Sequence, residues 1–312
     1  MSIACVGTGN VGRAWAIVFA RAGHRVRLYD VDEGALNGAL DAISRSVDSL
    51  ASAGEVEDAK KLLGLIQPER SLPAALHGVE YVQESISERL SLKQAVFKEL
   101  DQHCSPEVLL ASSTSELAPS TFLTELEHPQ RCLVAHPVNP PYLIPLVELC
   151  PGPDTSPAAL DSAEALLTGC GMSCLRLKKE VNGFVMNRLQ GALLREALRL
   201  TESGVCSPED VDRALTEGLG RRWVFLGPFA TGHLNSSTGF RGYMDMLGPA
   251  WRRLFDEMRE DVTWSDTLVD GAADALAERY PEDAIAAAQA WRDKRLIQLN
   301  QHLNAQLNYK KD

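Results

Sequence analysis

The pattern that most constrains the fold of this chain is a glycine-rich turn between a strand-like and a helix-like segment. Residues 2–6 are apolar and β-prone, Gly7-Thr-Gly-Asn-Val-Gly12 fits G-x-G-x-x-G, and residues 13–22 have helical composition. The alternating segment 25–29 then leads to Asp30, eighteen residues after Gly12. A strand, a turn, a helix and a second strand in this order predict a βαβ unit with parallel strands.

Alternation of strand-like and helical segments continues through the first half of the chain. Further strand-like runs occur at 81–82, 108–111, 132–135 and 173–177, with a helical stretch at 90–100. This alternation predicts an α/β fold, a doubly wound and mainly parallel sheet covered by helices. Beyond about residue 180 strand-like runs vanish and helical periodicity dominates, as at 187–201. A chain of 312 residues suits two domains, so we expect an α/β domain at 1–180 and an all-α domain at 181–312.

Composition and charge exclude several classes of partner. The net charge of −11 disfavours nucleic acid and anionic membrane surfaces, because both would repel the chain at long range. No apolar run approaches membrane-spanning length, and we expect no membrane partner. The seven cysteines are odd in number and scattered, which is typical of reduced thiols in a cytoplasmic protein. Cys170 and Cys174 have no second ligand pair after them, so no metal site is expected.

The glycine turn has a specific meaning when it lies between a strand and a helix. Gly7 permits the tight turn, Gly9 lets the backbone approach a pyrophosphate, and Gly12 lets the helix pack close to the strand. Asp30, at the end of the next strand, would accept hydrogen bonds from ribose hydroxyls and repel a 2′-phosphate. We therefore predict NAD rather than NADP, bound by Gly7, Thr8, Gly9, Asn10, Val11, Gly12 and Asp30. The alternative is a helix-capping loop without a ligand.

Polar residues follow two later strands, where a catalytic site is expected. Ser112-Ser-Thr-Ser115 comes after an apolar run, and His136 ends the next strand before a proline-rich turn. Glu148 lies in the apolar run 146–149, where an unpaired carboxylate would be costly, so it needs a partner. A histidine oriented by a carboxylate is a suitable general base. There are two alternatives. The hydroxyls and Asn187 would cap helices, and His136 would have a structural role.

Together these segments resemble the 3-hydroxyacyl-CoA dehydrogenase superfamily over nearly the whole chain. The similarity is carried by residues 7–12 with Asp30, 83–88 with Lys93, 112–115, 136–141, Glu148 and 183–189. Within the superfamily, residues 144–149 and Gly218–Trp223 are similar to the λ-crystallin branch, the L-gulonate 3-dehydrogenases. The resemblance implies a Rossmann domain followed by a helical domain that mediates homodimerisation.

The resemblance also implies roles for individual residues. It makes His136 the catalytic base and Glu148 its orienting partner, with Ser115 and Asn187 holding the reacting oxygen. It places Glu88 and Lys93 near the nicotinamide ribose, and Asn139 near the nicotinamide and the substrate. The expected reaction is NAD-dependent oxidation of the 3-hydroxyl of a small hydroxy acid, L-gulonate above all.

The substrate prediction depends on charged residues in both halves of the chain. Acyl-CoA members carry lysines after the second strand, whereas residues 41–51 here read Asp-Ala-Ile-Ser-Arg-Ser-Val-Asp-Ser-Leu-Ala. Arg222 could bind a small carboxylate through two hydrogen bonds, although a surface ion pair explains it equally well. The alternatives are a 3-hydroxyacyl-CoA dehydrogenase, an L-carnitine dehydrogenase, and a non-catalytic crystallin-like protein that binds NAD.

Overall fold

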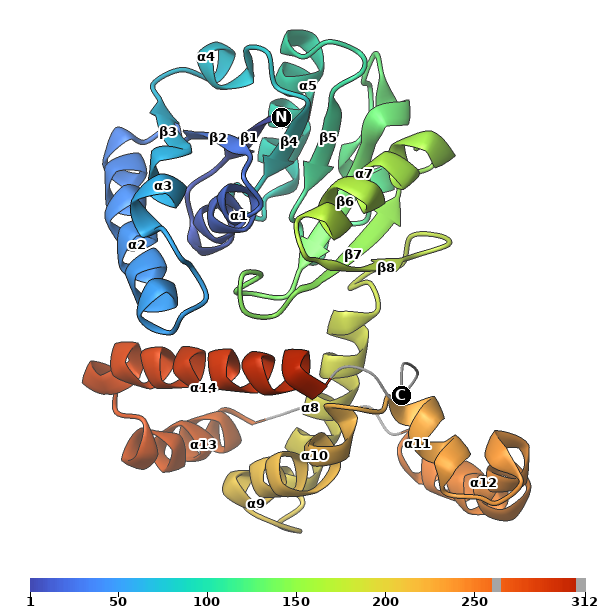
Figure 1. Cartoon of the computed structure of the whole chain (residues 1–312). Helices are drawn as coiled ribbons and strands as arrows, with labels where there is room; N and C mark the ends of the chain where they lie inside the picture. The colour runs from blue at the N-terminus through green and yellow to red at the C-terminus, as the bar shows by residue number, and fades with distance from the viewer. Residues whose placement is uncertain (260–264, 307–312) are drawn as a thin grey trace. The chain divides into compact units, whose positions relative to one another are not determined.

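The computed structural model describes residues 1–259 and 265–306, which form two compact units (Figure 1). One unit comprises residues 1–187 and the C-terminal segment from Arg292, and the other comprises residues 188–291. This division differs from the expected domains at 1–180 and 181–312, since the last segment returns to the first unit. Ile297 is buried in the core of that unit, and Asn300 Nδ2 donates to the Leu143 carbonyl at 2.6 Å. That residues up to 180 bind the cofactor, and those from 181 the substrate and a second copy of the chain, stays a prediction.

The first unit is built on one sheet in the order β3-β2-β1-β4-β5-β6-β7-β8. All neighbouring strands pair in parallel except β6 and β7, which are antiparallel. The strands are β1 Ser2–Val6, β2 Arg25–Tyr29, β3 Ile66–Glu69, β4 Tyr81–Glu84, β5 Leu109–Ser112, β6 Cys132–Pro137, β7 Leu146–Pro151 and β8 Ser173–Arg176. The chain runs outward from β1 to β3 and then returns to the other side of β1 at β4. The predicted α/β class with a mainly parallel sheet is confirmed.

Helices cover both faces of this sheet, as Figure 1 shows. Successive side chains of β1 alternate between two cores, because strand side chains alternate between faces: Ile3 and Cys5 lie in one core, Ala4 and Val6 in the other. The helices of the first core are α1 Asn10–Arg21, α2 Glu33–Ser52, α3 Ala59–Gly64 and α7 Pro157–Gly169, together with Ile297 of α14 Ile285–Gln306. Those of the second core are α4 Leu72–Leu76, α5 Leu90–His103 and α6 Pro119–Phe122. A short 3-10 turn, η1 Pro129–Arg131, precedes β6.

Two local features were not anticipated. The sequence after Asp30 predicts one long helical segment to about residue 63, but the structure divides it into α2 and α3, with Gly54 between them at a φ of 79°. The left-handed region is open to glycine at little cost, so the helix can end there. The strand β3 also escaped prediction. It holds only four residues, lies at the sheet edge and contains Pro68, a residue that edge strands tolerate and that weakens a strand pattern.

The second unit contains only helical elements in its described residues. They are the main part of α8 Met186–Glu202, then α9 Pro208–Arg213, η2 Ala214–Leu219, α10 Gly220–Trp223, α11 Pro228–Leu234, α12 Gly239–Glu257, α13 Asp266–Arg279, η3 Glu282–Ala284 and the start of α14 Ile285–Gln306. Ser207 caps α9 through a hydrogen bond from Asp210 N, as its position before a proline predicts. Among the described helices, none combines the length and the apolar character needed to cross a bilayer.

The cysteines are all free thiols, and burial keeps those in the core protonated. Burial raises the pKa of Cys104 and Cys170 to about 11 and that of Cys132 and Cys150 to about 12. A thiol is nucleophilic and binds metal only as the thiolate. These four residues therefore act as small apolar side chains.

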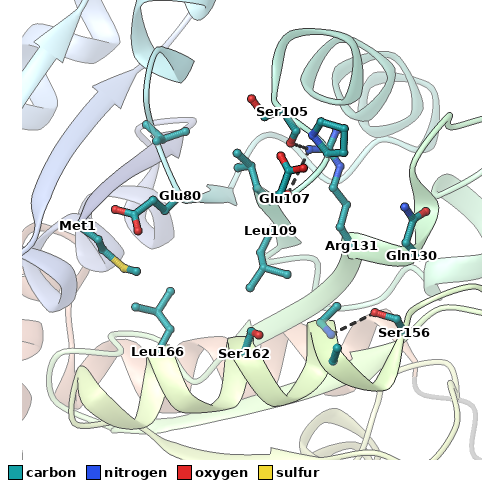
Figure 2. A pocket seen from close by; sticks show the side chains of 15 residues that line it. Met1, Glu80, Ser105, Glu107, Leu109, Gln130, Arg131, Ser156, Ser162 and Leu166 are labelled. Atoms are coloured by element: carbon teal, nitrogen blue, oxygen red, sulfur yellow. Dashed lines mark hydrogen bonds between the residues drawn. The ribbon is translucent and has the colours of Figure 1, made fainter.

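At the amino ends of β1, β4, β5 and β6, a groove of about 610 Å³ opens against α7 (Figure 2). Its lining includes Arg131, which is almost completely buried. The guanidinium Nη2 donates to Asp101 Oδ1 at 2.7 Å, and the other Arg131 hydrogen bonds go to backbone carbonyls. None of the predicted site residues lines this groove. The ion pair between Asp101 and Arg131 connects the end of α5 to the residue before β6, which is a structural role.

The Asp101–Arg131 pair predicts a specific loss of stability. Burial opposes the charged form of Asp101, but hydrogen bonds from Arg131, His128 N and Glu127 N outweigh it and lower the pKa of this carboxyl. We expect Asp101→Ala to lower the free energy of unfolding by about 3 kcal/mol at neutral pH, because it leaves the Arg131 charge buried and unpaired. The measurement is urea denaturation followed by circular dichroism.

The matched control is Asp161→Ala in α7, which breaks an exposed ion pair with Arg176 and should cost less than about 1 kcal/mol. Because the pKa of Asp101 is lowered in the folded state, its contribution is complete above the pKa in the unfolded chain. It is lost as the pH falls through the lower folded-state value, so the two variants should converge in stability in acid. Equal losses at neutral pH would contradict the role of this pair.

Candidate active site

His136 and Glu148 are directly opposite each other in the antiparallel pair β6–β7. Their side chains meet, with His136 Nδ1 and Glu148 Oε2 at 2.8 Å. Glu148 is fully buried, and the imidazole keeps only a small exposed fraction. A carboxylate beside Nδ1 favours the tautomer with the proton on Nδ1, which leaves the Nε2 lone pair free to accept a proton. The register of two strands thus supplies a histidine of defined tautomer.

The second oxygen of Glu148 holds the start of α8. Oε1 accepts from the backbone N–H groups of Val185 at 2.8 Å and Met186 at 3.0 Å. These donors lie at the N-terminus of the helix, where amide groups lack partners within the helix and favour negative charge. Gly183 and Phe184 precede them with φ angles of 72° and 47°, so the chain turns sharply before α8 begins. The Phe184 ring packs against His136, with centroids 5.4 Å apart.

The hydroxyl cluster after β5 has separate tasks. Ser112 Oγ donates to Glu84 Oε2 at 2.5 Å, Ser113 belongs to a second network, and Thr114 Oγ1 donates to Glu88 Oε1. Only Ser115 keeps its hydroxyl out of these networks. Asn187 Nδ2 donates to the Ser115 carbonyl at 2.6 Å, so the structure brings these two predicted residues together. Asn187 is the second residue of α8 and does not act as its N-cap, because Glu148 binds the preceding amides.

The ammonium group of Lys93 is buried between two carboxylates. Nζ lies 2.9 Å from Glu84 Oε1 and 3.9 Å from Glu88 Oε2. Glu84 also accepts from Ile86 N at 2.6 Å, which fixes the loop after β4. Lys93 therefore lies beneath Glu88 rather than at the surface. The contact of both residues with the nicotinamide ribose stays a prediction.

The glycine loop is closely packed at Gly7 and Gly12 and open at Gly9. A Cβ built on Gly7 would lie 2.6 Å from Ser85 O, and one built on Gly12 would lie 1.9 Å from Gly7 O. A Cβ on Gly9 would meet nothing within 4 Å, and no side chain caps the first turn of α1, where Asn10 and Val11 begin the helix. The loop therefore combines close packing at Gly7 and Gly12 with open space at Gly9, beside a helix N-terminus that no N-cap side chain covers. This arrangement fits a pyrophosphate at the helix N-terminus.

Asp30 is held in place at the carboxyl end of β2. Its Oδ2 accepts from Thr8 N and Thr8 Oγ1, both at 2.8 Å, and its Oδ1 accepts from Asp32 N at 3.0 Å. A carboxylate has about four acceptor positions, so one stays available for a ribose hydroxyl. The negative charge at this position opposes a 2′-phosphate. Asn139 is exposed in the loop after β6, and nothing in the structure tests its expected contact with the nicotinamide.

The remaining predicted residue, Arg222, belongs to the second unit, and two residues of the first unit have roles that were not identified from the sequence. Arg222 is an exposed residue of α10 in the second unit. No cluster of three potential metal ligands was found in residues 1–259 and 265–306. The structural roles of Gln83 and Glu84 were missed, although polar residues inside the buried strand Tyr81-Val-Gln-Glu84 were a signal that they have partners.

A glycine loop at the carboxyl edge of a parallel sheet, beside a buried histidine and carboxylate, defines the class of protein: an NAD-dependent dehydrogenase that acts on a CH–OH group. Comparison with known proteins agrees. The chain belongs to the 3-hydroxyacyl-CoA dehydrogenase family, whose NAD binding domain matches residues 2–181 and whose C-terminal domain matches residues 183–296. The predicted family and the predicted cofactor, NAD, are thereby confirmed.

Individual relatives are similar over nearly the full length. Lambda-crystallin of Oryctolagus cuniculus is 42% identical over 96% of this chain and 97% of its own. L-carnitine dehydrogenase of Pseudomonas putida is 34% identical over 95% and 92% of the two chains. Among solved structures, 5-formyl-3-hydroxy-2-methylpyridine 4-carboxylic acid 5-dehydrogenase has a TM-score of 0.84 at 27% identity, covering 97% and 98% of the chains.

The glycine loop yields a prediction that separates folding from cofactor binding. Gly9→Ala should change the free energy of unfolding by less than about 1 kcal/mol, because its Cβ points into open space. It should weaken NADH binding by about tenfold or more, since the added methyl lies where the pyrophosphate must approach. Fluorescence titration with NADH and thermal unfolding measure the two effects.

Gly7→Ala is the matched control. It combines a φ of 95° with a 2.6 Å approach to a backbone oxygen, so it should destabilise the fold by about 1–3 kcal/mol or more. If Gly9→Ala bound NADH as tightly as the unmodified protein, the loop would not be the pyrophosphate site.

Proposed function

We propose that this dehydrogenase oxidises the 3-hydroxyl of a small hydroxy acid, L-gulonate being the preferred candidate, with His136 as the general base. The observation that carries the proposal is the His136–Glu148 pair. Its Nδ1 is occupied by a buried carboxylate, so Nε2 is the nitrogen that can accept the hydroxyl proton. Bound NAD supplies the acceptor for the hydride that leaves the same carbon.

Each residue of the site has a task in this reaction. Neutral His136 removes the proton from the hydroxyl, and the Glu148 carboxylate stabilises the imidazolium that forms. Ser115 and Asn187 are near each other, and we propose that they hold the oxygen as it becomes a carbonyl. The reaction requires the neutral imidazole, because only then does Nε2 have a lone pair that can accept the proton.

The choice of a small acid is supported by exposed charges. In the segment 41–51 of α2, the exposed residues are Asp41, Arg45, Asp48 and Ser49. One positive and two negative charges are poorly suited to the phosphates of coenzyme A. Arg221 and Arg222 are exposed on α10, and we propose that Arg222 binds the substrate carboxylate. L-carnitine is the second candidate, because L-carnitine dehydrogenases are among the relatives over nearly the whole chain.

We also propose a homodimer formed through the helical unit. The amphipathic α8 has no fully buried residue in the monomer, and large apolar side chains are exposed along the unit. They include Leu189, Leu194, Phe225, Phe229, Met246 and Phe255. A second copy of the chain would cover such a surface.

We propose a cytoplasmic location, which the free thiols of all seven cysteines support.

Glu148→Gln tests the orientation of the base. The amide oxygen can still accept from Val185 N and Met186 N, but the amide N–H then faces His136 Nδ1 and favours the opposite tautomer. We expect kcat/KM to fall by about 10²–10⁴-fold, as for His136→Asn, while stability and NADH affinity stay unchanged. The measurements are NADH formation, thermal unfolding and NADH titration.

Glu148→Ala is the comparison variant, because it removes the acceptor for both amides as well. It should lose stability in addition to activity, by about 1–3 kcal/mol. Full activity of Glu148→Gln would show that the carboxylate does not orient the base.

A substrate panel tests the reaction itself. NADH formation should be fastest with L-gulonate, compared with L-carnitine, other 3-hydroxy acids and 3-hydroxybutyryl-CoA. Arg222→Met should raise KM for the acid by about 10- to 100-fold, since a charge-assisted hydrogen bond contributes about 1.5–3 kcal/mol. Arg221→Met, the equally exposed neighbour, is the control and should leave KM unchanged. Faster turnover of the CoA thioester, or none of any compound, would refute the assignment.

A further inference from the structure

A second polar network lies at the carboxyl edge of the sheet and takes no part in the proposed proton transfer. Ser113 Oγ is its centre, with Trp15 Nε1 at 3.1 Å, Gln83 Nε2 at 2.7 Å and Ser85 Oγ at 2.8 Å. Behind it, Tyr81 donates its hydroxyl to Gln83 Oε1 at 2.7 Å. The network joins α1 to the ends of β4 and β5, all within the first unit.

The orientation of the Gln83 amide follows from its surroundings. Gln83 Nε2 lies 3.3 Å from the carbonyl oxygen of Ala135, the residue before His136. If the amide were reversed, two carbonyl oxygens would face each other at that distance, without a hydrogen between them. The nitrogen must therefore be on this side, and it also points at Ser113.

The orientation of Gln83 fixes the hydrogen bonds of the next two residues. The indole N–H of Trp15 can only donate, and Gln83 Nε2 donates as well, so Ser113 Oγ accepts two hydrogen bonds and has used both lone pairs. The Ser113 hydroxyl hydrogen must then go to Ser85 Oγ. Ser85 accepts that bond and keeps its own hydrogen, for which the described part of the chain offers no acceptor.

The half-buried Ser85 lies beside the glycine loop. It directly follows β4, and Gly7 directly follows the adjacent strand β1. A Cβ built on Gly12 would lie 3.3 Å from Ser85 Cβ. The connections leave β1 and β4 in opposite directions along the sheet, and a crevice at such a switch point is where open α/β sheets bind ligands.

We propose that Ser85 binds the NAD cofactor by donating its hydroxyl hydrogen to an oxygen of the dinucleotide, and that Ser113 is a positioning residue that sets the direction of this bond. The phosphates and ribose hydroxyls of NAD offer many acceptors and suit a single fixed donor. Trp15, Gln83 and Tyr81 stabilise this one arrangement from behind. The proposal rests on NAD binding alone and not on the identity of the hydroxy acid.

The test is NADH affinity measured by fluorescence titration in the absence of any hydroxy acid. Ser85→Ala should raise Kd by about tenfold, the value of one hydrogen bond of about 1.4 kcal/mol. Ser87→Ala is the control, because Ser87 is exposed in the same loop and its hydroxyl has no hydrogen-bond partner among residues 1–259 and 265–306, while its carbonyl accepts from Arg89 N. It should leave Kd unchanged. Equal Kd values for the two variants would overturn the proposal.

Ser113→Ala tests the positioning role. It should raise Kd by less than Ser85→Ala does, and the double variant should bind NADH as Ser85→Ala does, because Ser113 acts through Ser85. Independent, additive losses would refute this part of the proposal.

The Trp15 indole N–H resonance gives a readout that does not depend on catalysis. In a ¹⁵N-labelled protein, Ser113→Ala should shift this resonance by removing its acceptor, whereas Ser85→Ala should leave that acceptor in place. Adding NADH should perturb the resonance in the unmodified protein and in Ser87→Ala, and perturb it less in Ser85→Ala. An identical NADH response in all three would contradict a link between Ser85 and the cofactor.

Discussion

The buried carboxylate of Glu148 is the interaction on which the rest of the site depends. A fully buried charge costs several kcal/mol unless its oxygens are hydrogen-bonded. Here the donors come from His136 on the neighbouring strand and from the amides that open α8. Glu148 therefore connects the β6–β7 register, the left-handed turn at Gly183 and the start of the helix. The same carboxylate orients the imidazole of His136, so the group that stabilises this part of the fold also sets the orientation of the proposed base.

Buried polar groups also fix the positions of the other side chains at the carboxyl edge of the sheet. Glu84 at the end of β4 forms a buried ion pair with Lys93 of α5, and it also accepts from Ser112 Oγ and from Ile86 N in the loop after β4. These bonds occupy hydroxyls that a sequence presents as equivalent, and they do not involve the hydroxyl of Ser115. The opposite edge has a groove, but the hydrogen bonds of the buried Arg131 in its lining go to Asp101 and to backbone carbonyl groups. Pocket size alone is thus a poor guide to the site, and the arrangement of donors and acceptors is a better one.

Much of the fold could be predicted because its signals are local. Strand, glycine loop, helix and strand over residues 2–29 are each specified by neighbouring residues, and all four were found at the expected places. The prediction failed where a short edge strand, β3, carries a proline and little apolar sequence. It also failed at Gly54, where one residue ends a helix. The return of the chain from Arg292 to the first unit had no local signal, because it depends on contacts between residues far apart in sequence.

The sequence by itself determined the family, the NAD-binding loop and the residues of the proposed catalytic pair, since these depend on residue types at fixed spacings. Only the tertiary structure decided how the polar groups are paired. It placed Glu148 between a histidine and a helix, gave each hydroxyl after β5 a different partner, and left the Ser85 hydrogen free beside the glycine loop. The physical reason is that a hydrogen bond depends on the distance and direction between atoms. Chain positions such as 15, 83 and 113 acquire that relation only when the sheet and its helices have assembled.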